Sequence, residues 1–425
     1  MNTLLKNISV RYALLNLLTL CAIFSPAHSA YFIDSGIDMG TSNSAVLGDF
    51  DGDGDLDVFL ANNGANKVWF NNGSGIFTDS GQSLGFVNAD SLSADAGDID
   101  NDGYLDIFVA NYDHSNTVLL NNGAGRFVMS GQVTQNYDSI WVALSDIDND
   151  RDLDAFVVNL EESDRLWLNN GFGHFDFGAQ YMGIAHEATC VVLADADGDN
   201  DPDVFKANFD GPDKIMINHR GVFTNSNQDI GNSDSRHLAV GDLNGDGHPD
   251  IFIAKPSDAN EVWLNNGKGI FTDSFQRLGK YSDSYRVALD DIDGDGDLDA
   301  FVLNKTRPDA VWMNNGLGYF HLGQELTASS TNHDTGTVLL GDLDGDGDPD
   351  AFLANNGQPP NKVWINAGGD TDGNGKIDIG DAILTLKISA GTGTDNTYLY
   401  ADISGDKKIG LEEAVFILQI LGKMK

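Results

Sequence analysis

The sequence predicts an all-β seven-bladed β-propeller followed by a small α-helical domain. Three observations predict this fold. An acidic nine-residue loop recurs seven times, beginning at Asp49, Asp98, Asp146, Asp195, Asp242, Asp291 and Asp342. The loops begin 47 to 51 residues apart, and each repeat holds four short runs of β-branched and aromatic residues. After residue 366 the pattern changes to two acidic loops that each precede an apolar run.

The sixth repeat illustrates the four expected strands. Residues 286–289 lead into the acidic loop, and residues 298–303 leave it. Residues 310–313 run into Asn314-Asn315-Gly316, and a fourth run begins at Tyr319. Asn-Gly turns between short apolar runs are typical of antiparallel hairpins. Seven such units are expected to close into a ring with few exposed strand edges.

The two ends of the repeat region indicate how the ring closes. Residues 31–36 match the fourth run of a repeat, whereas the seventh repeat stops after its third run at Asn366. We therefore expect the N-terminal strand to complete blade seven. The expected domains are a signal peptide over residues 1–29, the propeller over residues 30–366 and the C-terminal domain over residues 367–425.

The charge of the chain limits its partners. The formal net charge is −41, and about half of the 65 Asp and Glu residues stand in the seven loops. Such a surface repels phosphate, which argues against nucleic acid as a partner. The concentration of acid in the loops indicates metal sites rather than a solubilising coat.

The N-terminus is typical of a secretory signal. Lys6 and Arg11 precede an apolar run over residues 12–24, and small residues up to Ser29 suit cleavage. The run is short for a membrane span, so we expect none. We expect a secreted, extracellular protein in which Cys190 is the single remaining cysteine, so that metal rather than a disulfide supports the fold.

The acidic loops have the oxygen atoms that Ca²⁺ requires. Carboxylates alternate along each loop, and glycine stands where the backbone must turn sharply. Two carboxylates ~5 Å apart repel each other by about 3 kcal/mol at an effective dielectric of 20, so we expect the loops to open without a cation. Up to seven Ca²⁺ ions are therefore expected as cofactors of the propeller. Acidic turns without metal are the alternative.

Loops of the form DxDGDGxxD that follow a hydrophobic strand about every 50 residues resemble FG-GAP or VCBS repeats, as in integrin alpha propellers and bacterial secreted proteins. The resemblance covers about residues 31–366 and implies Ca²⁺ binding on one face of the propeller. Side chains at positions one, three, five and nine and the backbone carbonyl of position seven would bind the ion. These positions are Asp49, Asp51, Asp53, Asp55 and Asp57; Asp98, Asp100, Asp102, Tyr104 and Asp106; Asp146, Asp148, Asp150, Asp152 and Asp154; Asp195, Asp197, Asp199, Asp201 and Asp203; Asp242, Asn244, Asp246, His248 and Asp250; Asp291, Asp293, Asp295, Asp297 and Asp299; and Asp342, Asp344, Asp346, Asp348 and Asp350.

Two loops depart from the pattern at position six. Loop three has Arg151 and loop four has Asn200 where the other loops have glycine. Because Asn tolerates a positive φ better than Arg does, we expect loop three to bind Ca²⁺ most weakly and loop four moderately.

The C-terminal domain has two loop–helix units. A twelve-residue loop of EF-hand type precedes a helix expected over residues 382–388, and a second loop precedes a helix expected over residues 414–421. The pair resembles a dockerin module, which implies one or two Ca²⁺ ions and a cohesin-like partner. An EF-hand pair without that partner is the alternative, since Lys407 departs from the loop pattern. The implied ligands are Asp370, Asp372, Asn374, Lys376, Asp378 and Asp381, then Asp402, Ser404, Asp406, Lys408 and Glu413.

Residues that break the repeat indicate a ligand-binding face. Trp141, Arg236, His237, Tyr285 and Arg286 stand at the beginning of inner strands, at the end opposite the acidic loops. The variable connections between second and third strands should reach the same face. These connections carry Tyr112, His114, Phe209, Lys255, Lys305 and Arg307. Aromatic and cationic groups suit sugar stacking or an acidic ligand, whereas solvated surface loops are the alternative.

We therefore expect a secreted, calcium-stabilised adhesion or binding protein that recognises a glycan or an extracellular protein and docks through its C-terminal module. An extracellular polysaccharide lyase or hydrolase and a structural subunit of an extracellular assembly are the alternatives. The sequence contains neither GxSxG nor HExxH, and no acidic pair stands outside a repeated position. We favour a protein without enzymatic activity and assign no catalytic residue.

Overall fold

The structure is a computed structural model of the chain. It describes residues 32–131, 137–160, 162–178, 188–231, 234–280, 283–326, 336–357, 360–367 and 379–389, with Leu411, Ala414, Ile417 and Leu418. The chain forms two compact units, one of residues Phe32–Ala367 and one of Met1–Tyr31 with Gly368–Lys425. Among the described residues, no helix has both the length and the apolar character needed to cross a membrane.

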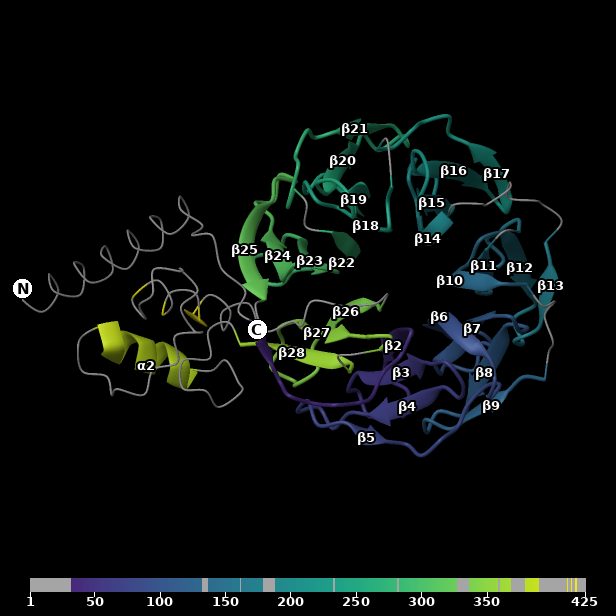
Figure 1. The fold of residues 1–425 in the computed structure, drawn as a ribbon, viewed down its shortest axis with the longest axis horizontal. Helices are drawn as coiled ribbons and strands as arrows, with labels where there is room; N and C mark the ends of the chain where they lie inside the picture. Colours follow the sequence, from purple (N-terminus) through teal and green to yellow (C-terminus); the bar gives the residue numbers. More distant parts are fainter. Residues whose placement is uncertain are drawn as a thin grey trace, which may run out of the picture. The chain divides into compact units, whose positions relative to one another are not determined.

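The unit Phe32–Ala367 is a seven-bladed β-propeller, which confirms the predicted fold of this part (Figure 1). Each blade is a four-stranded antiparallel sheet whose strands follow one another in sequence, apart from blade seven. Blades one to three comprise β2 (Ser44–Gly48), β3 (Asp57–Ala61), β4 (Lys67–Phe70) and β5 (Thr78–Asp79); β6 (Asp90–Gly97), β7 (Asp106–Tyr112), β8 (Thr117–Asn121) and β9 (Phe127–Met129); and β10 (Ser139–Ser145), β11 (Asp154–Asn159), β12 (Arg165–Asn169) and β13 (Phe175–Phe177). Blades four to six comprise β14 (Ala188–Ala194), β15 (Asp203–Asn208), β16 (Lys214–His219) and β17 (Val222–Asn225); β18 (His237–Gly241), β19 (Asp250–Ala254), β20 (Glu261–Asn265) and β21 (Phe271–Asp273); and β22 (Ser284–Asp290), β23 (Asp299–Asn304), β24 (Asp309–Met313) and β25 (His321–Leu326).

Blade seven contains strands from both ends of the propeller. β26 (Val338–Gly341), β27 (Asp350–Leu353) and β28 (Lys362–Asn366) form its inner part, and β1 (Phe32–Asp34) pairs antiparallel with β28. The ring of Phe32 lies 5.1 Å from that of Phe301 in blade six, edge to face. The same arrangement joins Phe252 and Phe320 in blades five and six, with 5.3 Å between the ring centroids. β1 therefore takes the position of the fourth strand in blade seven. It makes the backbone pairing of a fourth strand, and its Phe32 makes the aromatic contact that Phe320 makes in blade six.

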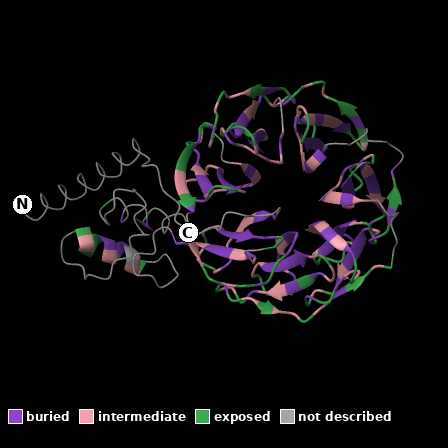
Figure 2. Cartoon of the chain, viewed as in Figure 1, coloured by how far each residue is buried: buried purple, intermediate pink, exposed green. Residues whose placement is uncertain are grey.

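The hydrophobic core lies between the blades. The second strands are almost wholly buried, as Figure 2 shows for the interior of the ring. Ile99 and Phe108 of blade two pack with Val157 and Trp167 of blade three in one cluster. Since each cluster combines two neighbouring blades, a blade depends on its neighbours for much of its buried surface.

The Asn at the end of each third strand links neighbouring blades, a role that the turn pattern did not predict. Its side-chain nitrogen donates a hydrogen bond of 2.7–2.8 Å to the carbonyl of the second loop residue in the preceding blade. In blade one, Asn71 reaches Leu343 of blade seven, so the contact crosses the closure. The seven residues are Asn71, Asn121, Asn169, Asn218, Asn265, Asn314 and Asn366.

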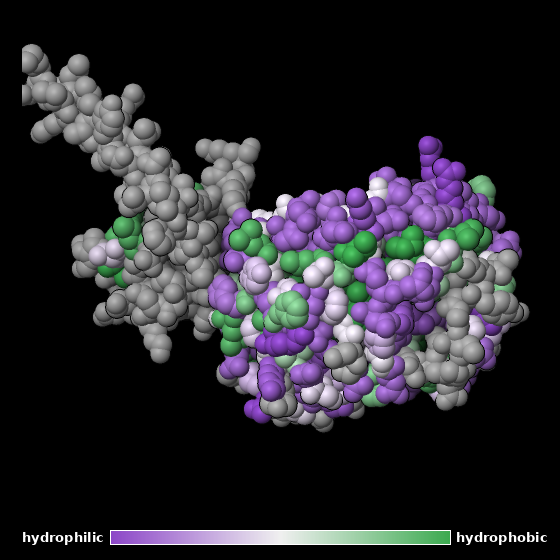
Figure 3. Space-filling view, turned by 90° about the horizontal axis from the view of Figure 1, so that it is seen from above, coloured by the Kyte–Doolittle hydropathy of each residue, from purple (hydrophilic) through white to green (hydrophobic). Residues whose placement is uncertain are grey.

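The outer surface of the propeller, seen from its edge, is mainly hydrophilic with separate hydrophobic patches (Figure 3). Phe172, in the turn between β12 and β13, is 80 % exposed, and Phe275, which follows β21, is 81 % exposed. These aromatic side chains stand away from the core and suit control substitutions.

The second unit contains α2 (Ile379–Ser389), which begins three residues before the helix that the sequence predicts. α2 buries Ala382 and Thr385. Asp381 lies within α2, whereas the other proposed ligands of this unit lie outside the described residues, as does the predicted signal peptide. The EF-hand pair therefore stays a prediction.

Candidate functional site

The acidic loops all lie at the carboxyl ends of the inner strands. Asp49 directly follows the last residue of β2, and Asp342 directly follows the last residue of β26. The backbone has a positive φ at positions four and six in every loop, including Gly52 and Gly54 in loop one. The loops therefore share one conformation on one face of the ring.

Loop one shows how the backbone shapes the carboxylate cluster. Asp49 accepts hydrogen bonds from the backbone nitrogens of Gly52, Asp53 and Gly54 at 2.8, 3.1 and 3.1 Å. Asp57 accepts one from Phe50 at 3.0 Å and one from Asn71 at 2.8 Å. Asp57, at position nine, thus also links the loop to the end of the third strand through hydrogen bonds. The sequence did not reveal this role.

The geometry of the loops fits Ca²⁺. Carboxylate oxygens of Asp49, Asp51 and Asp53 lie within 4.8 Å of one another. Burial, together with the repulsion of neighbouring carboxylates, raises the pKa of Asp57 to about 6 and that of Asp299 to about 8. Buried Oδ1 atoms without a hydrogen-bond partner among the described residues belong to Asp51, Asp100, Asp146, Asp197 and Asp291. A hard divalent cation would use these oxygens and relieve the repulsion between the carboxylates.

Side chains at position seven cover the turn after the third strand. A Cβ atom at Gly123 would lie 2.3 Å from the ring of Tyr104, and one at Gly267 would lie 2.3 Å from His248. Both glycines also have a positive φ. Close approach and backbone conformation together therefore require glycine at these turns.

Loops three and four carry the expected departures in the left-handed conformation. The φ angles are 79° at Arg151 and 68° at Asn200. A side chain in this region costs about 1–2 kcal/mol, least for Asn. The weaker Ca²⁺ affinity of these loops stays a prediction.

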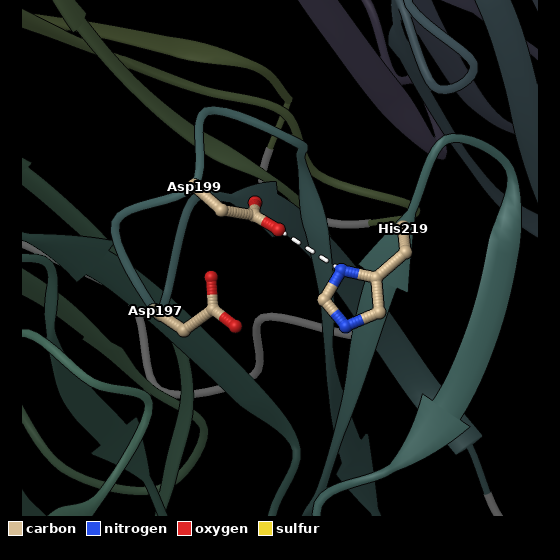
Figure 4. Close-up of side chains that lie close together, drawn as sticks. All are labelled: Asp197, Asp199 and His219. Atoms are coloured by element: carbon tan, nitrogen blue, oxygen red, sulfur yellow. Dashed lines mark hydrogen bonds and ion pairs between the residues drawn. The ribbon is translucent and has the colours of Figure 1, made fainter.

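Loop four has a histidine neighbour that the sequence analysis missed. His219 points toward the loop, and its Nδ1 lies 2.9 Å from Oδ2 of Asp199, while Asp197 lies beside them (Figure 4). His219 replaces the second Asn of the Asn-Asn-Gly turn, which here reads Asn-His-Arg-Gly. That break in the repeat was the available signal. The contact gives the position-five carboxylate a competing partner.

Four of the five proposed ligand-face residues line a single pocket. Trp141, Arg236, Tyr285 and Arg286 stand at the beginning of β10, β18 and β22, at the ends opposite the acidic loops. We call this pocket, of about 370 Å³, the mouth pocket. All seven blades contribute to its lining, which places it at one end of the central channel. Its other lining residues are Asn43, Leu92, Ile140, Leu160, Ala188, Thr189, Phe209, Thr337 and Asn356.

Cations and aromatic rings alternate in the mouth pocket. The Arg236 guanidinium carbon lies 4.1 Å from the centroid of Phe209 and 5.3 Å from that of Tyr285. The Arg286 guanidinium carbon lies 5.7 Å from the ring of Trp141. Cation–π contacts of this kind hold a guanidinium in place without neutralising its charge.

Other residues proposed for this face have different positions. The ring centroid of His237 lies 5.3 Å from that of Trp141, and burial together with the Arg286 charge lowers the pKa of His237 well below its usual value. The imidazole is therefore a neutral packing partner. The expectation that Lys255 is on this surface is wrong, because Lys255 is buried and its Nζ lies 2.9 Å from Oε1 of Glu261. Cys190 is also buried, and burial raises its pKa to about 12, which suits a structural thiol.

The channel continues inward from the mouth pocket. Trp141 and Thr337 line both the mouth and the next cavity, which Asp95 also lines. Asp95 accepts hydrogen bonds from the backbone nitrogens of Leu144 at 2.8 Å and Ala96 at 2.9 Å. Burial raises its pKa to about 6 in spite of these donors.

Comparison with known proteins agrees with the repeat. The FG-GAP-like repeat matches residues 49–109, 98–157, 146–206, 195–253, 242–302 and 291–353, which together cover well over half of the chain. Each match runs from one acidic loop past the beginning of the next. No curated protein is similar in sequence at a significant level.

Solved structures with similar folds include two lectins. An Agrocybe aegerita lectin that recognises non-reducing terminal N-acetylglucosamine is 20 % identical, with a TM-score of 0.51 over 76 % of this chain and 87 % of its own. The BP39L lectin of Burkholderia pseudomallei is 14 % identical, with a TM-score of 0.57 over 78 % and 97 %. BBS1N in complex with ARL6DN is 10 % identical, with a TM-score of 0.54 over 80 % and 96 %. At these identities the similarity concerns the fold.

Proposed function

Because this chain belongs to the FG-GAP-like repeat family, we propose that it is an extracellular, calcium-stabilised propeller that binds a glycan in the mouth pocket. One observation carries the proposal. The residues that break the repeat at the beginning of the inner strands come from three blades, yet they line one pocket. Residues that only stabilise the ring have no reason to differ from blade to blade at this one place.

The size and lining of the mouth pocket support a glycan. A volume of about 370 Å³ is at the lower end of the range of small-molecule sites. A pocket of this size accepts a small ligand or the end of a chain, but not a folded protein. Trp141, Tyr285 and Phe209 offer ring faces, and the apolar face of a pyranose packs well on such rings. The similar folds of two lectins support a propeller scaffold for this task.

The acidic loops support the calcium part of the proposal. Ca²⁺ would bind at the Asp-rich face, at the far end of the inner strands from the ligand. The ion would neutralise clustered carboxylates and so hold the seven turns in place. Its role here is structural, since the pocket residues lie at the opposite ends of the strands.

The second unit supports attachment to a partner. The two predicted EF-hand-type loops would bind Ca²⁺ and orient two helices, of which α2 exposes Ile379, Ile383 and Leu386. We assign this unit to calcium-dependent docking, with a cohesin-like domain as the partner. Isothermal titration of the full chain against a cohesin domain, with and without Ca²⁺, tests this part. The absence of calcium-dependent heat would contradict it.

A glycan array with the full chain in Ca²⁺ tests the ligand assignment. We expect selective binding that Trp141→Ala reduces at least about tenfold, the effect of losing a stacking ring worth ~1.5 kcal/mol. Phe275→Ala removes an aromatic side chain that is 81 % exposed elsewhere on the ring and serves as the matched control.

Three results would contradict the proposal. They are the absence of glycan binding, binding that survives Trp141→Ala, and equal losses in Trp141→Ala and Phe275→Ala. Turnover of a bound polysaccharide would instead favour the enzyme alternative.

A further inference from the structure

Two arginines in the mouth pocket have no acidic partner among the described residues. Among the described residues, the Arg286 guanidinium donates to the backbone carbonyls of Tyr285 at 3.0 Å and Arg236 at 3.5 Å and to no carboxylate. The Nε atoms of Arg236 and Arg286 are buried and have no hydrogen-bond partner there. None of the described residues that line the pocket is Asp or Glu.

Two buried lysines elsewhere in the propeller each form an ion pair with a carboxylate. Lys206 lies 2.7 Å from Asp164, and Lys255 lies 2.9 Å from Glu261. Both lysines are almost fully buried, and both have a carboxylate within ion-pair distance. In a chain with a net charge of −41, acidic partners are plentiful. The two arginines of the mouth pocket, which are partly buried with buried Nε atoms, differ from these lysines in having no such carboxylate among the described residues.

Their arrangement is unfavourable without a ligand. A partly buried guanidinium loses some of its hydration, which carbonyl oxygens and aromatic rings replace only in part. The two positive charges also disfavour each other, and burial lowers the pKa of Arg286 from its usual value. An anion placed between them would offset both costs. A pocket with two uncompensated positive charges therefore suits a ligand that carries a negative charge.

The geometry favours a carboxylate carried by a sugar. A guanidinium presents a planar fork that pairs with a carboxylate through two parallel hydrogen bonds. The two guanidinium groups lie against the rings of Phe209, Tyr285 and Trp141, and all three rings line the pocket. An acidic peptide would use the charges but not this ring surface, whereas a hexuronate uses both.

We propose that the mouth pocket selects glycans that carry a carboxylate, with Arg236 and Arg286 binding the carboxylate and Trp141 packing against the sugar ring. This inference rests on the proposed glycan-binding function and names its ligand class. It assigns the selectivity to two residues that the repeat alone would not place together.

Titration calorimetry with matched probes tests the inference on the full chain in Ca²⁺. The probes are trigalacturonate, its methyl ester, galactotriose and a tri-glutamate peptide. We expect trigalacturonate to bind at least about tenfold more tightly than its methyl ester, since the ester keeps the ring and loses the charge. Arg286→Gln and Arg236→Gln should each reduce that preference at least about tenfold, and Arg286→Lys should restore part of it. Arg126→Gln removes an exposed arginine of blade two and is the matched control.

The outcomes separate the two levels of the proposal. In one outcome, the acid, the ester and galactotriose bind equally, and this binding is lost in Trp141→Ala but kept in both Arg→Gln variants. That result would overturn the carboxylate preference and leave glycan binding intact. Tighter binding of the peptide than of trigalacturonate would overturn the sugar assignment. If none of the probes binds and the array is also empty, both levels fail. Melting curves of each variant show whether a loss reflects unfolding.

Discussion

The two ends of the inner strands of this propeller follow opposite rules. At the carboxyl ends, seven loops repeat one acidic pattern, and the Asn at the end of each third strand makes the same hydrogen bond in every blade. At the amino ends, the corresponding positions are occupied by Ser44, Ser93, Trp141, Cys190, His237, Arg286 and Thr337. The first end is uniform and acidic, whereas the second is varied, aromatic and cationic.

This difference reflects two separate requirements of a repeat protein, which are closure of the ring and binding of a ligand. Ring closure needs the same contact seven times, so selection for the fold keeps one residue type at one position. A ligand on the ring axis meets all seven blades from different directions, so each blade requires its own residue. Substitutions at the uniform end should therefore change stability without changing ligand binding, and substitutions at the varied end should do the reverse.

The largest effect should follow removal of Ca²⁺. At a hundredfold excess over its Kd, each bound ion contributes about 2.7 kcal/mol to the free energy of unfolding, and up to seven loops contribute. We expect EDTA to lower the melting temperature by roughly 10 °C or more, and Ca²⁺ but not Mg²⁺ to restore it. Calorimetric melting curves measure this. An unchanged melting temperature in EDTA would contradict the proposal that Ca²⁺ in the acidic loops stabilises the fold.

The hydrogen bonds between blades should give the next effect. In Asn265→Ala, the carbonyl of Ala196 loses one of its two donors and keeps the backbone nitrogen of Gly269, and the backbone nitrogen of Gly267 loses its acceptor. We expect the free energy of unfolding to fall by about 2 kcal/mol, with ligand binding unchanged. Urea unfolding in Ca²⁺ measures it. The neighbouring Asn266 is exposed and bonds only within its own turn, so Asn266→Ala should cost well under half as much. Equal costs for the two variants would contradict a special role for the contact between blades.

Asp95 lines the cavity next to the mouth pocket, between the two ends of the inner strands. Its pKa is about 6 in the folded chain and close to 3.8 when unfolded, so the folded state holds its proton more tightly. The favourable contribution is complete below pH 3.8 and is lost as the pH rises through 6. Asp95→Asn should therefore stabilise the protein at about pH 7.5 by about 1–2 kcal/mol, and by clearly less at about pH 5, when both forms are saturated with Ca²⁺. Paired urea titrations at the two pH values measure this, and a difference that does not vary with pH would contradict it.

Loop three offers the smallest change. Arg151→Gly should release the left-handed strain at position six and raise the free energy of unfolding in Ca²⁺ by about 1 kcal/mol. Asn200→Gly in loop four should give a smaller gain. Direct calcium titration should show tighter binding of the weakest site in the first variant. A gain for Asn200→Gly equal to that for Arg151→Gly would contradict the expected order of the loops.

The repeat made much of the fold readable from sequence. One acidic loop or one Asn-Gly turn is a weak signal, but seven copies in register fix the blades, and the phase of the ends predicted the place of β1. The pocket residues were found in the same way, as departures from a known pattern. Trp141 and Arg286 were recognisable because the five equivalent positions hold neither Trp nor Arg: they are Ser44, Ser93, Cys190, His237 and Thr337.

Contacts between distant segments could not be predicted. Asn71 reaches the carbonyl of Leu343, which is 272 residues away, and nothing local in the sequence distinguishes it from a turn residue. His219 lies within hydrogen-bond distance of Asp199, which is 20 residues away and is separated from it by the hairpin of β15 and β16. Lys255 was misplaced because its partner, Glu261, sits on the next strand and draws the side chain into the interior.

The closing strand has a consequence for the order of folding. Asp34 pairs with Lys362, 328 residues later, so the ring cannot close until almost the whole propeller has been synthesised. Blades two to six can form from neighbouring segments as the chain emerges, whereas β1 must wait with its unpaired strand edge exposed. Closure of so long a loop is entropically costly and should be the slow, late step. The first strand made is therefore the last one placed, and the nascent chain is most open to domain swapping or aggregation during that interval.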